Sequence, residues 1–411
     1  MKIAFIGLGA MGLPIACRLA ETGVAELSLF DLAEGRRALA RGLGSVPDTI
    51  GAALDGSDLV ITVLPADRHV EMVSQDVLAR ARPGQLYADL STIAPATMDR
   101  VAGQLEQAGV QTVSVALTRG AAAARAGTLA LFVGPGGAVP DRLEPVLAAM
   151  STEIRYTATL GGAKALKVAN NMAMCLIDIA VCEALVLGER YGLDAGTVVA
   201  ALPGHGADSW VLRNHVAQNI LHGDLGPGHF STRNMLKDVR LHQDLAADAQ
   251  VAAFLPAIAA SCYRGVIAAG HAEDYHPIVV EWLRQAAATT AAPQAAAPQA
   301  ADHVSQAGDQ STLAVLGRGV AAIAALASLD ALRVLDYYGL EPGEAADHLA
   351  TASAGNQSLA GAAGWLAGDD AALDPAGLRL ALHDMIELAD AADYPALLPE
   401  TALAAARLLG R

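Results

Sequence analysis

The sequence predicts an α/β domain with a doubly wound sheet, then an all-α domain, and then a second, degenerate copy of that all-α domain. Strand and helix patterns alternate over residues 1–160, as they do where helices cover both faces of a mainly parallel sheet. Strand patterns end there, and Ala- and Leu-rich stretches with helical periodicity fill the chain from residue 161 onward. Two stretches of this helical part also resemble each other in sequence.

The first strand, Lys2–Ile6, runs directly into a turn in which Gly7, Gly9 and Gly12 follow the pattern GxGxxG. Gly7 permits a tight turn, and Gly9 lets a pyrophosphate approach the backbone. Gly12 lets the next helix lie close to the strand, so that the helix N-terminus faces the anion. Because a helix-like stretch, Leu13–Glu21, follows the turn, the pattern predicts a dinucleotide-binding Rossmann domain. An ordinary strand–turn–helix without a nucleotide is the alternative.

The second strand, Glu26–Phe30, ends at Asp31, which lies 19 residues after Gly12. In such domains an acid about 20 residues beyond the turn binds the ribose hydroxyl pair. The charge of a carboxylate at this point repels a 2′-phosphate, so we expect NAD as the cofactor. Arg36 and Arg37 follow closely and keep NADP as an alternative.

Five further strand patterns complete the predicted sheet, with helical stretches between most of them. They are Leu59–Leu64, Leu86–Asp89, Thr112–Ala116, Ala130–Val133 and Glu153–Tyr156. Beyond the sheet, Ala163–Tyr191 is helical by period and propensity. Pro293 and Pro298 punctuate an Ala- and Gln-rich tract, where we expect a flexible tether, with a frayed helix end as the alternative.

These patterns divide the chain into four parts. We expect a dinucleotide-binding domain at 1–160, a catalytic all-α domain at 161–288, a linker at 289–311, and the degenerate all-α repeat at 312–411. The repeat rests first on the match of Cys182–Gly196 with Leu329–Gly343. It rests also on the match of Leu236–Asp238 with Leu382–Asp384. Two unrelated Ala-rich helix pairs are the alternative.

The composition limits the partners and the compartment. A formal net charge of −16 argues against a nucleic acid or an anionic membrane surface as partner. We find no uninterrupted apolar run long enough to span a membrane, so we expect a soluble protein. The four cysteines show no CxxC pairing and lie in apolar surroundings. We interpret them as buried thiols of a reducing compartment, which predicts a cytoplasmic protein.

Five motifs follow one another along about the first 270 residues. They are Gly7-Leu-Gly-Ala-Met-Gly12, Asp89-Leu-Ser-Thr-Ile-Ala-Pro95, Gly127-Thr-Leu129, Lys167-Val-Ala-Asn-Asn171 and Lys237-Asp238. In this combination the chain resembles the β-hydroxyacid dehydrogenases, which include 3-hydroxyisobutyrate dehydrogenase and tartronate semialdehyde reductase. The resemblance implies an NAD(P)-dependent oxidoreductase that interconverts a small hydroxy acid and its semialdehyde or keto form by hydride transfer.

The resemblance implies that Lys167 is the general acid and base. Hydride transfer from a carbinol carbon requires loss of the hydroxyl proton, which an amine accepts in oxidation and returns in reduction. Asn171 lies four residues on and shares a helix face with Lys167, so its amide is placed to orient the substrate and the lysine. A surface position on an amphipathic helix is the alternative for Lys167. We expect that surface position for the nearby Lys164.

Five residues are expected to contact the substrate, namely Ser91, Thr92, Thr118, Arg119 and Gly120. Ser91 and Thr92 follow a strand and lie on the carboxyl edge of the sheet, where they would hold a carboxylate or, alternatively, cap a helix. Thr118 keeps a hydroxyl where the family has a serine, whereas Arg119 replaces a glycine. We expect Arg119 to pair with a substrate carboxylate, sulfonate or phosphate, and an arginine that faces solvent is the alternative.

The resemblance extends the cofactor site beyond Gly7, Gly9, Gly12 and Asp31. It implies contacts from Ala10 and Met11 in the glycine turn, from Leu64 and Pro65 after the third strand, and from Lys237. An ion pair within its own helix is the alternative role for Lys237. No metal is expected.

The second helical copy lacks the catalytic set, since Lys167, Asn171 and Lys237 correspond to Ala314, Arg318 and His383. We therefore expect a structural copy that packs on the first as an intrachain pseudo-dimer, with a homodimer of chains as the alternative. The expected partner is a small anionic substrate. Three alternative functions remain: a 6-phosphogluconate-type decarboxylating dehydrogenase, an imine reductase, and a nucleotide-binding scaffold without turnover. Imine reductases generally lack a lysine at the position of Lys167.

Overall fold

The computed structural model describes residues 1–290 and 306–409, and these residues form two compact units. The sheet unit consists of Met1–Val168 with Tyr337–Leu340, and the helical unit of Ala169–Asp336 with Glu341–Arg411. The division after Val168 falls inside one helix, α8 (Leu160–Arg190). Most of both predicted helical domains belongs to the helical unit, but residues 161–168 of the first and 337–340 of the second belong to the sheet unit. The predicted linker lies outside the described residues at 291–305, and its last residues, from Gln306, are helical.

One seven-stranded sheet forms the framework of the sheet unit, in the order β2-β1-β3-β4-β5-β6-β7. Its strands are β1 (Lys2–Ile6), β2 (Glu26–Phe30), β3 (Leu59–Thr62), β4 (Leu86–Asp89), β5 (Gln111–Thr118), β6 (Leu129–Gly134) and β7 (Ser151–Tyr156). Strands β1 to β5 pair in parallel, β6 is antiparallel to β5, and β7 is parallel to β6. The seven predicted strands are confirmed, and each end lies within two residues of its predicted position.

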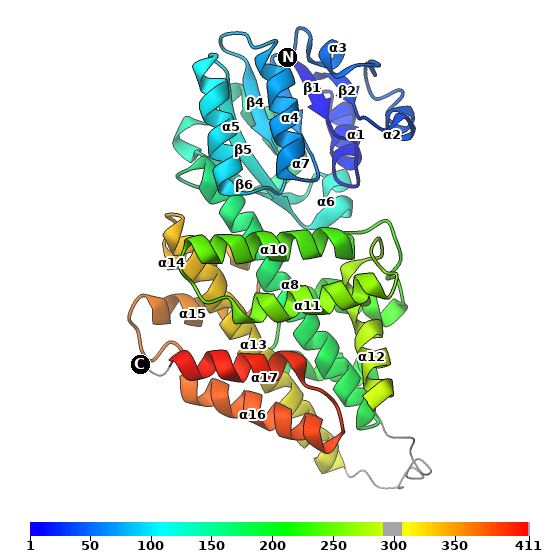
Figure 1. Ribbon diagram of the computed structural model, residues 1–411, viewed down its shortest axis with the longest axis vertical. Helices are drawn as coiled ribbons and strands as arrows, with labels where there is room; N and C mark the ends of the chain where they lie inside the picture. The colour runs from blue at the N-terminus through cyan, green and yellow to red at the C-terminus, as the bar shows by residue number, and fades with distance from the viewer. Residues whose placement is uncertain (291–305, 410–411) are drawn as a thin grey trace. The chain divides into compact units, whose positions relative to one another are not determined.

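Helices cover both faces of this sheet, as predicted (Figure 1). On one face lie α1 (Gly12–Thr22), α6 (Gly120–Ala126) and α7 (Glu144–Met150). On the other lie α3 (Ile50–Leu54), α4 (Asp67–Leu78) and α5 (Pro95–Gln107), while α2 (Glu34–Leu39) buries no residue. A hydrophobic core lies on each face of the sheet, and alternate strand residues pack into one or the other. Ile3 and Phe5 pack on the first face, and Ala4 and Ile6 on the second.

The helical unit contains helices and isolated bridges in its described residues. After α8 come α9 (Ala195–Ala201), α10 (Thr232–Asp248), α11 (Phe254–Ala268), α12 (Val279–Thr290), α13 (Gln306–Tyr337), α14 (Pro342–Ala350), α15 (Leu359–Leu366), α16 (Pro375–Ala391) and α17 (Leu397–Ala406). The short helices of the chain are η1 (Gly136–Ala138), η2 (Asp141–Leu143), η3 (Leu202–His205), the π-helix η4 (Leu212–Val216), η5 (Ile220–His222), η6 (His276–Ile278) and η7 (Arg407–Leu409).

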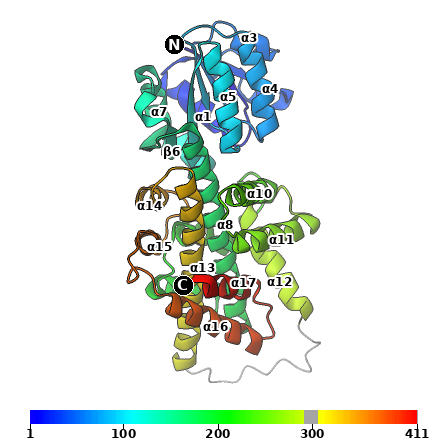
Figure 2. The ribbon, with the colours of Figure 1, turned by 60° about the vertical axis from the view of Figure 1, so that its left-hand side comes forward.

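The helices repeat in order along the helical unit. The long helices α8 and α13, of 31 and 32 residues, lie side by side in both views (Figures 1 and 2). The starts of α9 and α14, at Ala195 and Pro342, are 147 residues apart, and those of α11 and α17, at Phe254 and Leu397, are 143 apart. This order supports a duplicated helical unit. The second sequence match pairs residues that are 146 positions apart. This spacing differs by three residues from the spacing between the starts of the two helices on which the matched residues lie.

The prediction that no run is long and apolar enough to span a membrane is wrong by length and composition. Both α8 and the Asp309–Tyr337 part of α13 contain an 18-residue window of mean hydropathy 1.8. That window is completely buried inside the protein in α8 and 72% buried in Asp309–Tyr337. Such burial is typical of core helices, in which apolar residues on every side meet other parts of the protein.

The cysteines, all four of which the structure describes, are free thiols. Cys175, Cys182 and Cys262 are buried as predicted, whereas Cys17 is half-buried. Burial raises the pKa of the Cys175 and Cys182 thiols well above the ordinary value, so both are protonated, unreactive core residues. The cytoplasmic location stays a prediction.

A fully buried carboxyl group joins the two helical copies. Glu183 of α8 accepts hydrogen bonds from the backbone N–H of Leu398, near the start of α17, at 3.3 Å from each oxygen. Burial raises the pKa of Glu183 to about 8, and the backbone amides of Leu398 and Leu397 oppose this shift. The carboxyl group is therefore largely protonated at neutral pH in the folded protein.

The raised pKa predicts a pH-dependent stability. Because the folded protein keeps a proton that the unfolded chain loses, the contribution of Glu183 is complete below about pH 4.5 and disappears as the pH rises through about 8. Urea unfolding between these values should show the free energy of unfolding of the wild type falling relative to Glu183→Gln. Glu341→Gln, at an exposed site, is the control. Parallel pH profiles for wild type and Glu183→Gln would contradict the expectation.

Candidate active site

The glycine turn has the shape that a dinucleotide needs. Gly7 has φ +102°, and its N–H donates to the Phe30 carbonyl at 2.8 Å. A Cβ at Gly7 would lie 2.3 Å from the Val63 carbonyl oxygen, and one at Gly12 would lie 1.9 Å from the Gly7 oxygen. A Cβ at Gly9 would meet nothing within 4 Å. The backbone at Gly9 therefore faces open space, where a pyrophosphate fits.

Helix α1 begins at this turn without a side-chain cap and without an acidic residue in its first turn. Its N-terminal N–H groups are thus suited to an anion, because no carboxylate competes for them. Ala10 is exposed and Met11 half-buried at this helix start. The residues present fit the predicted cofactor, and the bound dinucleotide would supply the hydride acceptor.

Asp31 stands at the end of β2 and supports the same turn. Its Oδ2 accepts from the Leu8 N–H at 2.7 Å, and its Oδ1 accepts from the Ala33 N–H at 2.8 Å. Each carboxylate oxygen retains a lone pair for a ribose hydroxyl. Arg37 donates through Nη1 to the Asp31 carbonyl at 2.7 Å and lies over the Phe30 ring. Arg36 is exposed.

The loop after β3 adjoins the glycine turn. The Leu64 side chain would lie 3.2 Å from a Cβ at Gly7, and Pro65 is exposed directly after it. The structure thus brings the predicted cofactor residues of the sheet unit together. Lys237 belongs to the helical unit.

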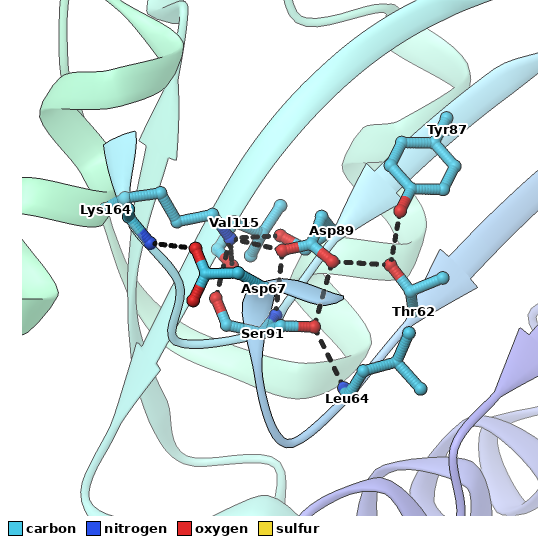
Figure 3. A network of polar contacts seen from close by, with 9 residues as sticks. Thr62, Leu64, Asp67, Tyr87, Asp89, Ser91, Val115 and Lys164 are labelled. Atoms are coloured by element: carbon cyan, nitrogen blue, oxygen red, sulfur yellow. Dashed lines mark hydrogen bonds and ion pairs between the residues drawn. The ribbon is translucent and has the colours of Figure 1, made fainter. Parts of the chain in front are cut away.

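Lys164 is not the surface lysine that the sequence suggested. Its side chain is fully buried, and Nζ lies 2.7 Å from Asp89 Oδ1, in an ion pair with a carboxylate that is equally buried. The ammonium also donates to the carbonyls of Asp89 and Ser91, at 2.8 and 2.9 Å (Figure 3). The sequence pattern could not show this, because the partners of Lys164 lie 73 and 75 residues earlier.

Ser91 belongs to the same polar network. Its hydroxyl donates to Asp89 Oδ2 at 2.9 Å and accepts from the Leu64 N–H at 2.9 Å (Figure 3). The Asp67 carboxylate accepts from the Ala94 N–H at 2.9 Å and holds the far end of this loop. A substrate carboxylate would compete with Asp89 for the Ser91 proton, whereas the half-buried Thr92 follows in the loop. Substrate contact by both residues stays a prediction.

Arg119 faces a carboxylate of its own unit. Its guanidinium forms an ion pair with Glu153 of β7 and donates to the Thr128 carbonyl at 3.3 Å. The backbone of Arg119 has φ +83°, a left-handed conformation that favours glycine. The buried Thr118 precedes it, and Gly120, with φ +79°, begins α6. The arginine is thus more than a solvated side chain, and its substrate contact stays a prediction.

The predicted catalytic residues lie on α8. Lys167 is half-buried, and Asn171 is buried one turn further on. In the helical unit, Asn171 Nδ2 donates to Asp238 Oδ2 at 2.5 Å, and Asp238 Oδ1 forms an ion pair with Lys237 Nζ at 2.9 Å. The buried Asp238 therefore joins two of the predicted site residues. The helical ion pair considered for Lys237 is also present.

Asn170 extends this network into the second helical copy. Its Nδ2 donates to Asn171 Oδ1 at 3.1 Å and to Ser353 Oγ at 2.8 Å, and its Oδ1 accepts from the Ala354 N–H at 2.9 Å. Sequence analysis missed this role, although the adjacent asparagines in an otherwise apolar helix were a signal. Sequence analysis also missed a second group of buried polar residues. One of them is Asp178, a carboxylate in the middle of an apolar stretch of α8.

The buried ion pair predicts a large effect of Lys164→Met on stability. Removing the ammonium leaves Asp89 charged and unpaired in the core, which costs about 3–5 kcal/mol. The double variant Lys164→Met/Asp89→Asn leaves no buried charge and should recover much of the loss. Urea unfolding of the three proteins provides the comparison. A Lys164→Met protein as stable as the wild type would show that the pair is dispensable.

Comparisons with known proteins agree with this geometry. Residues 2–161 match the family described as the NAD binding domain of 6-phosphogluconate dehydrogenase. Residues 161–283 match the family described as NAD-binding of NADP-dependent 3-hydroxyisobutyrate dehydrogenase. The second helical copy lies beyond these matches.

Individual relatives match about two thirds of the chain. An NAD-dependent L-serine dehydrogenase of Pseudomonas aeruginosa is 31% identical over 68% of this chain and 96% of its own length. A probable 3-hydroxyisobutyrate dehydrogenase of Mycobacterium tuberculosis is 34% identical over 69% and 97%. The solved structure of Mycobacterium tuberculosis 3-hydroxyisobutyrate dehydrogenase with L-serine superposes with a TM-score of 0.64 at 33% identity, over 69% of this chain and 99% of that one.

These matches and the glycine turn lead to one assignment. The relatives are named as dehydrogenases, and the matched domains bind NAD or NADP. The chain is an NAD(P)-dependent oxidoreductase that acts on CH–OH groups, and it belongs to the β-hydroxyacid dehydrogenase family.

Proposed function

We propose that the chain oxidises the primary hydroxyl group of a small hydroxymethyl carboxylate, with NAD as the preferred acceptor and Lys167 as the general base. The observation that carries the proposal is the position of Lys167 on α8, one turn before an Asn171 held by the buried Asp238. A fixed amide and a half-buried amine on one helix face suit the binding and deprotonation of a hydroxyl group.

The relatives suggest the substrate class. They are named for L-serine, 3-hydroxyisobutyrate and 2-(hydroxymethyl)glutarate. All three compounds carry a CH₂OH group on the carbon next to a carboxylate, and they differ in the remaining substituent. We therefore expect this core to be required here, with the third substituent setting the preference. A panel of these acids, followed by the absorbance of the reduced nicotinamide, tests the class.

The proton follows a short path in the proposed reaction. As hydride leaves the CH₂OH carbon, the hydroxyl oxygen becomes a carbonyl oxygen, and the neutral Lys167 amine takes its proton. In the reverse direction the ammonium returns that proton. Asn171, whose Nδ2 is committed to Asp238, has its carbonyl oxygen oriented by Asn170. The asparagine pair thus holds a rigid polar surface beside the base.

The preference for NAD rests on Asp31. Its carboxylate is fixed by two backbone N–H groups, so it cannot easily turn away from a 2′-phosphate. Arg37 is already bound to the backbone carbonyls of Asp31 and Leu32, at 2.7 and 3.1 Å. The arginine that would neutralise a 2′-phosphate is therefore engaged elsewhere.

We infer also that the two helical copies form a pseudo-dimer within one chain. Glu183 of α8 meets the start of α17, and Asp330 of α13, 147 residues later, lines a small pocket with Phe254 and Leu255 at the start of α11. Acids at equivalent positions of the two copies thus lie near the start of the equivalent helix of the other copy, as in a twofold interface. Asp330 Oδ2 also lies 3.7 Å from His242 Nε2 of α10. Such packing supports a chain that works as a monomer.

Lys167→Ala tests the general base. Loss of the amine should lower kcat by about 10²–10⁴-fold, because the hydroxyl proton has no acceptor. Dinucleotide binding, followed by protein fluorescence, should be unchanged. Lys2→Ala, at a partly exposed lysine, is the control. Near-normal kcat in Lys167→Ala would exclude this role.

Arg119→Gly tests the arginine without backbone strain, because glycine accepts the left-handed conformation at this position. If Arg119 binds a substrate anion, KM should rise about tenfold or more while kcat changes little. Glu153→Gln frees the guanidinium and should not raise KM. An unchanged KM in Arg119→Gly would limit the arginine to its ion pair with Glu153.

Truncation after residue 290 tests the pseudo-dimer. It removes α13 to α17 and exposes the buried apolar face of α8 and the Glu183 carboxyl group. We expect aggregation or self-association of the fragment and a monomeric full chain, both measured by size-exclusion chromatography with light scattering. A soluble, active and monomeric fragment would contradict this interpretation.

A further inference from the structure

Three buried side chains of the helical unit have the composition of a metal site. Asp178 comes from α8, His215 from the π-helix η4 and His276 from η6. Their ligand atoms all lie within 4.8 Å of one another, and each residue is at least 95% buried. Two imidazoles and one carboxylate are a common donor set for zinc and related divalent metals.

The distances between the donors fit one central ion. His215 Nδ1 lies 2.9 Å from both carboxylate oxygens of Asp178, and His276 Nδ1 lies 3.5 Å from Oδ2. A tetrahedral zinc ion with bonds of about 2.0–2.1 Å holds its ligand atoms roughly 3.3 Å apart. The two separations lie on either side of this value, and the two imidazole donors lie within 4.8 Å of each other. An ion would take the place of the hydrogen bond between His215 and Asp178.

His276 has one long hydrogen bond at Nδ1 and none at Nε2 among the described residues. Its Nδ1 lies 3.4 Å from the Tyr263 hydroxyl and 3.5 Å from Asp178, and its Nε2 has no hydrogen-bond partner among the described residues. A metal bond at Nδ1 would replace this long hydrogen bond and offset part of the cost of burying the ring, while Nε2 keeps no partner. This shortfall points to a ligand independently of the donor set.

A divalent cation would also stabilise the charge of the buried Asp178 carboxylate, in a place where water cannot.

We propose that Asp178, His215 and His276 bind one zinc-class divalent metal ion that joins α8 to η4 and η6. The role is structural, because the ligands are buried and come from three separate segments. With no exposed ligand, the metal would enter as the helical unit folds. The Tyr263 hydroxyl, which lies beside His276, is a candidate for the fourth ligand.

Metal analysis of the full-length chain tests the site. Wild type produced in zinc-supplemented medium should retain about one metal ion per chain after gel filtration, as measured by mass spectrometry of the elements. Asp178→Asn and His276→Asn should lose most of it. His242→Asn removes another buried histidine and should keep it. Metal-free wild type, or equal metal in wild type and Asp178→Asn, would overturn the proposal.

Cobalt substitution gives a readout that does not depend on the variants folding. Wild type produced with Co²⁺ in place of zinc should show the visible absorption bands of a four-coordinate site with nitrogen and oxygen ligands. Absence of these bands in a protein that holds cobalt would show adventitious surface binding and overturn the proposal. Dehydrogenase activity is not part of either measurement, so the proposed function stands or falls separately.

Discussion

The junction of the sheet with α8, the helix that follows its last strand, depends on one buried ion pair. Lys164 brings an ammonium group to the turn after β4, where the Asp89 carboxylate and three backbone carbonyls accept its hydrogen bonds. These partners make a desolvated charge tolerable there. The pair fixes which face of α8 meets the strand ends, and with it the side of the helix on which Lys167 stands. Thr62 and Ser91 complete the network, so the loop that carries Thr92 is held by the same contacts.

The helical unit shows how a duplicated sequence is used unequally. The first copy has Asn171 and the Lys237–Asp238 ion pair, whereas the second has Arg318 and His383 in place of Asn171 and Lys237. It keeps the acid as Asp384, which lies 3.3 Å from Arg318. The second copy still reaches the first through Ser353 and Ala354, which fix both ends of the Asn170 amide. It therefore supports the predicted catalytic asparagine without chemistry of its own.

Sequence patterns captured the features that depend on neighbouring residues. The strands, the glycine turn and the helix starts follow from local periodicity and backbone freedom, which is why they were predictable. The burial and ion pair of Lys164 were not predictable, because a lysine in an amphipathic pattern looks the same in sequence whether it meets water or a carboxylate 75 residues away. The Glu153 partner of Arg119 and the grouping of Asp178 with two histidines are long-range in the same way. Membrane-like hydropathy in α8 was also misjudged, because it reflects burial between other helices.

Joining both helical copies in one polypeptide changes how the interface responds to dilution. Two separate chains held by the same contacts would come apart at low concentration, whereas covalently joined copies keep a constant, high local concentration of each other. In the proposed monomer, folding and the packing of the two copies are a single unimolecular event, whose equilibrium is independent of how much protein the cell makes. In return, each pair of helical copies carries one lysine that we propose as the general base, instead of two.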